Sequence, residues 1–318
     1  MKSNWRLGLP LALTTAVFWG TVPIALSVVL KDMDPYTVTW YRFVIAAALL
    51  LPILVMSGRL PRLGSLGARP WLLVVFAIAG ISGNYVLFLL GLHFTSPTVT
   101  QVVSQLGPLF LMLAGVTILR ESLLGPQRWG IVVLIAGLLL FFNRRLPDLL
   151  TLSPGLGVGV ALLVLGAAVW SFYGMSQKLL QQYLGPQHIL LVVYLGSAVV
   201  LLPFVSPGEV TQLPVSHLAL LAFCGINTLV AYGAFAESLK HWEVSRVGAV
   251  LATTPLFTLV SMWVVGRIFP GLLEPEQVNA LGVVGALMVV AGSALCALGG
   301  TPKVAEIVEE PVAGRVGE

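Results

Sequence analysis

Amide side chains recur at helical spacing inside an apolar stretch of the sequence, residues 97–118. Thr98, Gln101, Gln105 and Pro108 follow one another at intervals of three, four and three residues, so a helix places all of them on one face. A buried amide costs free energy unless it meets a hydrogen-bond partner. The stripe therefore predicts either a wet cavity that binds a polar solute or hydrogen bonds to a neighbouring helix.

Aromatic side chains with a few polar neighbours recur at similar spacing in other apolar stretches. Such a lining suits a small amphipathic solute, and ordinary helix packing is the alternative interpretation. Besides the stripe above, the residues that we expect in this lining are Trp19, Asn84, Tyr85, Phe88, Trp170, Tyr173, Gln177 and Tyr232.

The residue types needed for catalysis or for a metal ion form no pattern of known chemistry. The sequence has no His-Glu-x-x-His helix, no cysteine cluster and no pair of carboxylates inside one apolar stretch. Cys224 and Cys296 are far apart and lie in apolar stretches, where they are expected to pack. We therefore expect no enzyme activity, no catalytic residue, no metal site and no cofactor.

The composition requires lipid around the elements that carry these residues. Hydrophobic residues make up 58% of the 318 positions and charged residues 9%, against about 25% charged residues in soluble domains. The apolar residues form long uncharged runs, which indicates an all-α polytopic membrane protein. The net charge of +4 comes from basic residues scattered between the runs, so membrane topology explains it better than a nucleic-acid partner does.

Ten uncharged runs are long enough to cross the hydrocarbon core as helices, which takes about 20 residues. The uncharged stretch 70–119 is too long for one crossing, so it is expected to fold back at Thr95-Ser96-Pro97. The expected spans are residues 8–30, 36–56, 71–92, 97–118, 126–143, 155–177, 187–205, 215–237, 245–267 and 278–298.

Two charged residues in or beside these spans are candidates for an electrostatic role. Arg42 either extends to the membrane interface, binds a substrate carboxylate or holds a neighbouring helix. Glu237, at the end of its span, is the nearest candidate for carrying a proton, because no Asp or Glu lies at the centre of any expected span. This pattern favours downhill transport over proton antiport.

Basic residues are unevenly distributed over the segments between the spans. Twelve lie on the side of the amino terminus and four on the other side, where they are Lys31, Arg144, Arg145 and Arg267. The bias predicts a protein of the bacterial inner membrane with both termini on the cytoplasmic side. The segment 301–318 is acidic and poor in apolar residues, and we expect a disordered cytoplasmic tail there.

The two halves of the chain match each other at constant offsets. The matching pairs are Trp19/Trp170, Pro35/Pro186, Pro52/Pro203, Tyr85/Tyr232, Phe88/Phe235, Pro108/Pro255, Arg120/Arg267, Gly130/Gly285 and Gly137/Gly292. Residues 1–148 and 149–300 are therefore expected to be two repeats of five transmembrane helices. Because five is odd, the second repeat enters the membrane from the opposite side, and the repeats are inverted with a substrate site near the midplane.

Several of these motifs resemble one family of carriers. The motifs are Phe18-Trp19-Gly20, Arg42-Phe43, the run 106–110, Arg120-Glu121, Gly130 and Gly137. On these residues, positions 8–298 resemble the EamA family of the drug/metabolite transporter superfamily and are similar to aromatic amino-acid exporters. The resemblance implies metabolite export through a central cavity. The second half departs from it at Val193, the counterpart of Arg42, which fits a one-sided role for the arginine.

The combined pattern predicts a secondary transporter that exports small organic metabolites by alternating access, with aromatic or other apolar amino acids as preferred substrates. One alternative is a proton-coupled carrier of drugs, sugars or nucleotide sugars; nucleotide sugars would need several basic residues in the cavity. A membrane-embedded enzyme or sensory anchor would need a catalytic constellation or an output domain. The expected partners are a small-molecule substrate and the lipid bilayer, without nucleic acid, and the carrier is expected to be a monomer or a weak homodimer.

Overall fold

The computed structural model of the chain describes residues 4–61, 63–118, 124–144, 146–150, 155–242, 244–273 and 278–298. Within these ranges the chain consists of α-helices and short 3-10 turns, without a β-strand. The Arg120-Glu121 motif and the tail at 301–318 lie outside the described residues.

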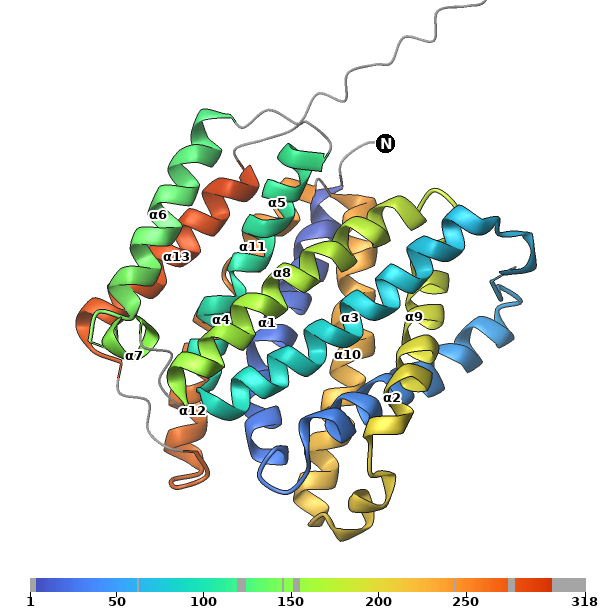
Figure 1. Cartoon of the computed structure of the whole chain (residues 1–318), viewed down its shortest axis with the longest axis horizontal. Coiled ribbons are helices and arrows are strands. Elements are labelled where there is room, and N and C mark those ends of the chain that lie inside the picture. Colours follow the sequence, from blue (N-terminus) through green and yellow to red (C-terminus); the bar gives the residue numbers. More distant parts are fainter. Residues whose placement is uncertain are drawn as a thin grey trace, which may run out of the picture.

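Long apolar helices make up most of the molecule (Figure 1). Eight helical segments of the described chain are long and apolar enough to cross a membrane. They are α1 (Trp5–Val29), α2 (Pro35–Met56), α3 (Ala68–Phe94), α8 (Leu156–Leu180), α9 (Pro186–Leu201), α10 (Val215–His241), α11 (Val244–Leu251) with α12 (Thr254–Ile268), and α13 (Ala280–Leu298).

The remaining helices are shorter. They are α4 (Pro97–Ser104), α5 (Leu106–Ile118), α6 (Gly125–Phe141) and α7 (Leu146–Leu150). Each expected span coincides with a helix or with two consecutive helices, and the expected turn at Thr95-Ser96-Pro97 separates α3 from α4. The crossing of the bilayer by α4–α5 and by α6, and with it the number of ten spans, stays a prediction.

Local sequence explains where several helices begin. The Asp34 carboxylate accepts hydrogen bonds from the backbone N–H groups of Tyr36 and Thr37, at 2.8 and 3.1 Å, and Pro35 occupies the first position of α2. Ser96 caps α4 in the same way, ahead of Pro97. An oxygen-bearing cap followed by proline is favoured at helix starts because proline lacks the N–H that would be unpaired there.

Two of the long helical segments are interrupted near their middle, each just before a proline. Gln105 separates α4 from α5 ahead of Pro108, and two residues separate α11 from α12 ahead of Pro255. A proline cannot donate to the carbonyl four residues earlier. In the second case the freed carbonyl of Leu251 accepts a hydrogen bond of 2.6 Å from the Thr254 hydroxyl.

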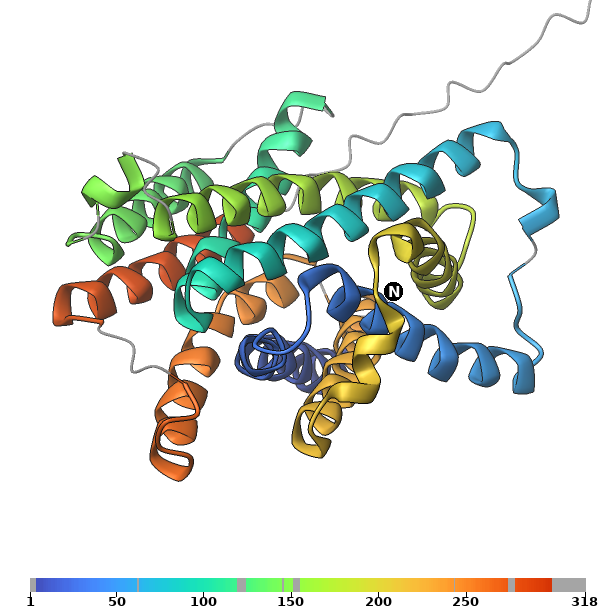
Figure 2. The ribbon, with the colours of Figure 1, turned by 60° about the horizontal axis from the view of Figure 1, so that its bottom comes forward.

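Helices from the two halves of the chain pack against each other in pairs. In Figures 1 and 2, α6 lies beside α13 and α3 beside α8, and α1 packs against α10. Glycines bring α6 and α13 together: a Cβ on Gly130 would lie 2.7 Å from the Cys296 nitrogen, and one on Gly137 2.7 Å from the Val289 nitrogen. Helices α6 and α13 run antiparallel at this crossing, because Gly130, the earlier of the two α6 residues, meets Cys296, the later of the two α13 residues.

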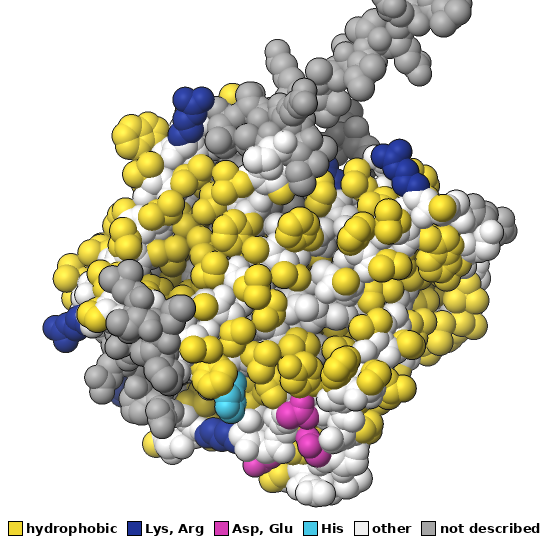
Figure 3. Space-filling view, viewed as in Figure 1, with side chains coloured by type: hydrophobic (Ala, Val, Ile, Leu, Met, Phe, Trp, Pro, Cys, Tyr) yellow, Lys and Arg dark blue, Asp and Glu magenta, His cyan; other side chains and the backbone are white. Residues whose placement is uncertain are grey.

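The surface of the molecule is largely apolar, as a lipid environment requires. Figure 3 shows hydrophobic side chains over most of one face, with the visible charged side chains toward its margin. Large side chains such as Trp129, Phe172 and Trp263 are 60% or more exposed. Apolar patches of this extent are uncommon on water-soluble monomers.

Candidate functional site

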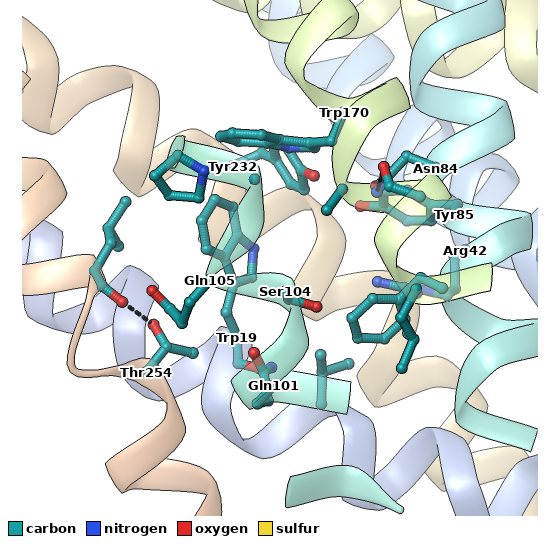
Figure 4. Close-up of a pocket in the computed structure, with 18 residues that line it drawn as sticks. Trp19, Arg42, Asn84, Tyr85, Gln101, Ser104, Gln105, Trp170, Tyr232 and Thr254 are labelled. Carbon is teal, nitrogen blue, oxygen red and sulfur yellow. Dashed lines mark hydrogen bonds between the residues drawn. The ribbon is translucent and has the colours of Figure 1, made fainter. Parts of the chain in front are cut away.

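A cavity of about 160 Å³ lies at the centre of the helices (Figure 4). Both halves of the chain contribute to its wall, through α1 to α5 in the first half and through α8, α10, α11 and α12 in the second. The described lining residues are Trp19, Val22, Arg42, Asn84, Tyr85, Phe88, Gln101, Ser104, Gln105, Gly107, Pro108, Leu163, Gly166, Ala167, Trp170, Tyr232, Leu251 and Thr254.

The cavity brings together most of the residues predicted from the sequence. Those that line it are Trp19, Arg42, Asn84, Tyr85, Phe88, Gln101, Gln105, Trp170 and Tyr232. They come from separate stretches of the chain that have no sequence proximity to one another. The helical spacing therefore selected faces of α1, α3, α4, α8 and α10 that meet at this cavity.

Four predicted residues do not line this cavity. Thr98 is fully buried one turn before Gln101. Tyr173 and Gln177 are buried farther along α8, where the Tyr173 backbone packs closely against Gly80 of α3. Glu237 lies near the end of α10, with its Oε1 atom 3.3 Å from His241 Nε2. Spacing selects a face of a helix but does not say how far along that face the cavity extends.

Several lining residues were not predicted. Ser104, Gly107 and Thr254 lie where the interrupted helices approach the cavity, and Gly166 and Ala167 leave room beside Trp170. The internal repeat carries a signal for Thr254, because Thr254-Pro255 is the counterpart of Gly107-Pro108. The small residues on α8 have no comparable signal in the sequence.

Arg42 is buried, at 5% exposure, and its side chain lines the cavity instead of extending to the membrane interface. Its Nε donates a hydrogen bond of 3.2 Å to the Thr228 hydroxyl, and its Cζ lies 4.4 Å from the centre of the Tyr85 ring. The Thr228 hydroxyl donates in turn to the Cys224 carbonyl at 3.0 Å. No Asp or Glu of the described chain forms an ion pair with Arg42. The arginine is thus held in place by neutral groups.

The amides of the predicted stripe line the cavity and also join helices. Gln101 Nε2 donates to the Trp19 carbonyl at 2.5 Å, and Gln105 Oε1 accepts from the Ser293 hydroxyl at 3.1 Å. On α3, Asn84 Nδ2 donates to the Gly166 carbonyl at 3.0 Å. Each of these side chains therefore forms a hydrogen bond with another helix and also lines the cavity, while the binding of a solute by the amides stays a prediction.

Gln101 provides a hydrogen-bond donor for a carbonyl of α1 that lacks its usual helical partner. Pro23 cannot donate to the carbonyl of Trp19, four residues earlier. The Gln101 amide supplies the missing donor from α4. Carbonyls on either side of Trp19 also accept side-chain hydrogen bonds, from Asn227 at 2.6 Å and from Thr258 at 2.7 Å. Side chains from three other helices thus stabilise this part of α1.

Aromatic rings form much of the remaining wall. The ring of Trp19 lies 5.2 Å from that of Tyr232 in an edge-to-face arrangement, and the rings of Tyr85 and Tyr232 are 6.2 Å apart. Trp170 covers Gly107, where a Cβ would lie 3.1 Å from the indole ring. The resulting site combines aromatic walls, neutral amides and one buried cation. It can hold a small, mainly apolar solute with an acidic group.

A second cavity of about 880 Å³ lies where α1 ends and α4 and α8 begin. Lys31, His93 and Arg144 are among its lining residues. Asn143 and Asn279 exchange two amide hydrogen bonds here, at 3.2 and 3.1 Å, and so join the end of α6 to the residues before α13. This cavity is a wide chamber at one end of the helices.

Comparisons with known proteins agree with the family resemblance seen in the sequence. The model of the EamA-like transporter family matches residues 6–143 and again residues 157–298. The "Uncharacterized inner membrane transporter YhbE" of Escherichia coli (strain K12) is 40% identical over 320 residues, which cover 99% of this chain and 100% of that protein. An "Uncharacterized transporter" of Haemophilus influenzae is 37% identical over 94% of this chain and 97% of its own length.

A solved crystal structure shares the fold. It has a TM-score of 0.63 with this chain at 19% sequence identity, and the match covers 92% of this chain and 96% of the other. The two separate family matches agree with the two halves found in the sequence, and the family resemblance is confirmed.

Proposed function

This chain belongs to the EamA-like transporter family, and on that premise we propose that it exports small organic solutes, with aromatic and other apolar amino acids as the expected substrates. The observation that carries the proposal is the central cavity, in which Trp19, Trp170 and Tyr232 provide apolar walls and Arg42 provides a cation for a carboxylate. We place the chain in a bacterial inner membrane, in keeping with the name of its Escherichia coli relative.

We further propose that the two halves are inverted repeats that alternate the access to this cavity. Packing between the halves supports the proposal. At the α6–α13 crossing, a Cβ on Gly130 would lie 2.9 Å from the Gly292 carbonyl, and a Cβ on Gly285, the counterpart of Gly130, 2.7 Å from the carbonyl of Gly137, the counterpart of Gly292. The other contacts have the same reciprocity, since α1 of the first half packs on α10 and α8 of the second half packs on α3. Such an exchange is expected when a two-fold axis relates the halves.

Transport is proposed to be downhill for the solute, with both termini in the cytoplasm. None of the described residues that line the cavity is Asp or Glu, so these residues provide no carboxylate for proton antiport. Glu237 is the remaining candidate for proton coupling and lies beside His241, away from the cavity. If an inward proton gradient accelerates export by the parent protein but not by Glu237→Gln, the downhill mechanism is wrong and proton antiport is the mechanism.

The proposal is tested by uptake of labelled amino acids into liposomes that contain the purified chain. The parent is compared with Trp170→Ala, which removes a wall of the cavity, and with Trp263→Ala, which removes an equally large ring from the outer surface of α12. We expect transport to fall about tenfold or more in the first variant only, since truncating a large aromatic side chain in a binding site commonly costs over 1 kcal/mol. Equal activity of all three proteins on every transported compound would contradict the assignment of the cavity.

A further inference from the structure

We propose that the cavity selects small apolar monocarboxylates that lack an ammonium group, and that the membrane potential drives their export. The inference rests on the proposed function, because it concerns the same cavity, and it departs from the proposed amino-acid substrates in favour of carboxylates with a net negative charge. It follows from the charge of the described lining, from the unpaired hydrogen-bond donors of Arg42 and from the cavity volume.

The guanidinium of Arg42 has hydrogen-bond donors without a partner in the described part of the chain. Of the nitrogen atoms in the Arg42 guanidinium, only Nε has a hydrogen-bond partner among the described residues, the Thr228 hydroxyl. The ring of Tyr85 lies under the same guanidinium, and its hydroxyl is buried near Thr228 and Tyr232. Both side chains line the cavity. The two Nη groups of Arg42 have no partner among the described residues, and a carboxylate with two acceptor oxygens can pair with a guanidinium through two parallel hydrogen bonds.

The net charge of the cavity with its solute favours an anion. A full charge near the middle of a membrane is costly unless an opposite charge accompanies it. A monocarboxylate beside Arg42 gives a neutral pair, whereas a zwitterionic amino acid adds no net charge and leaves the cation uncompensated. For an ammonium group, the described lining offers neutral oxygens such as those of Asn84 and Gln101 but no carboxylate. Neutral acceptors bind a cation more weakly than carboxylates do.

The volume sets the size of the solute. A cavity of about 160 Å³ is close to the volume of about 150 Å³ that holds one benzene molecule in an engineered apolar cavity. The cavity wall also includes the apolar side chains of Val22, Phe88 and Leu163. A branched aliphatic acid of five or six carbons or a benzoate-sized acid fits this volume.

The same charge balance gives the energy source. Export of a monoanion moves one negative charge out of the cell, and a membrane potential that is negative inside favours this direction. For one charge, the equilibrium gradient changes tenfold per 59 mV. Export of a net anion therefore needs neither a proton nor a carboxylate in the described cavity, in agreement with the absence of Asp and Glu from that lining.

The test compares two solutes with one carbon skeleton, leucine and 4-methylpentanoate, on liposomes that contain the full chain. Potassium gradients with valinomycin set the potential, and both labelled uptake and the transport current are recorded. We expect 4-methylpentanoate to produce a current and to be accumulated tenfold per 59 mV, with leucine transported at least tenfold more slowly and without a current. Passive leakage of the protonated acid carries no charge, so it does not contribute to the current.

The role of Arg42 is tested with charge-matched variants. Arg42→Gln should abolish the anion current, and Arg42→Lys should retain part of it because the charge stays while the planar donor pair is lost. Arg267→Gln is the matched control, because Arg267 also lies over an aromatic ring, that of Trp263, but outside the cavity. If Arg42→Gln does not fold, Thr228→Val removes only the acceptor for Nε and should raise the KM for the anion severalfold.

The outcomes separate this inference from the function on which it rests. Leucine uptake that exceeds 4-methylpentanoate uptake, without a current, would overturn the charge selection and leave the amino-acid exporter in place. An anion current that is unchanged in Arg42→Gln would overturn the role of the arginine. If the parent protein transports neither solute nor any other amino acid or carboxylate, both the inference and the proposed function fail.

Discussion

The two halves of the chain contribute differently to the cavity, although they match in sequence. Their aromatic residues are the same at equivalent positions, as Trp19 and Trp170 or Tyr85 and Tyr232 show. Their polar residues are not: the equivalents of Arg42, Asn84, Gln101 and Gln105 are Val193, Ala231, Gly248 and Ala252. The duplicated framework thus builds the walls from both sides, while the first half supplies the charge and the amides that can discriminate between solutes.

The packing explains why the charge is confined to one half. Arg42 reaches the cavity because Tyr85 and Thr228 hold its guanidinium there. Val193, its equivalent on α9, is 1% exposed and belongs to an apolar cluster that includes Phe43 and Tyr194. The two positions match in sequence, but only one of them faces a space that a solute can enter.

The largest loss of stability is expected when an arginine is placed at position 193, the equivalent of Arg42 in the second half. Val193→Arg would bury a cation in an apolar cluster without an acidic partner among the described residues, at a cost of several kcal/mol. We expect little or no monodisperse protein in size-exclusion chromatography of detergent extracts. Val193→Ala is the control and should lose only about 2 kcal/mol. A well-folded Val193→Arg protein would mean that this position can face the cavity after all.

The next prediction concerns a feature that the halves share. Gly137 and Gly292 are equivalent, and a Cβ on Gly137 would lie 2.7 Å from the Val289 nitrogen and a Cβ on Gly292 even closer to the Leu134 nitrogen of the opposite helix. Each Gly→Ala substitution should therefore destabilise the protein by a similar amount, about 3 kcal/mol, because both backbones would have to move apart. Thermal unfolding in detergent measures this.

Gly266→Ala is the control for the helix crossing. Nothing lies within 4 Å of a Cβ at Gly266, so alanine should be neutral or should stabilise α12 by up to about 1 kcal/mol. If Gly137→Ala were harmful and Gly292→Ala harmless, the equivalence of the two helices at the crossing would be wrong.

Sequence patterns predicted the helices well because lipid leaves few alternatives. Uncharged runs locate the spans, and the Ser96-Pro97 pair locates the turn between α3 and α4. The structure extends α1 and α3 a few residues farther at their starts, to Trp5 and Ala68, because a helix does not end where the apolar run ends. The apolar composition of a segment indicates which residues contact lipid, but the helix ends depend on backbone hydrogen bonds, which composition does not reveal.

The cavity was only partly predictable, since it depends on contacts between distant segments. Spacing suggested Gln101 and Gln105, which line the cavity, but also Tyr173 and Gln177, which lie on the same helix as Trp170 beyond the end of the cavity. The position of Arg42 depends on Thr228, which is 186 residues away in the sequence. No local pattern contains that information.

The smallest of the expected effects tests the amides of the first half directly. Gln101→Ala removes the donor that the Trp19 carbonyl needs because Pro23 cannot provide one, so a buried carbonyl is left unpaired at a cost of about 1–3 kcal/mol. Its equivalent, Gly248→Ala, adds a methyl group that would lie 3.2 Å from the Ala297 Cβ and removes no hydrogen bond. Thermal unfolding should therefore show a loss in Gln101→Ala only, together with slower solute uptake. Equal losses in the two variants would mean that packing at these two positions, and not the polarity of the first half, sets the difference between the halves.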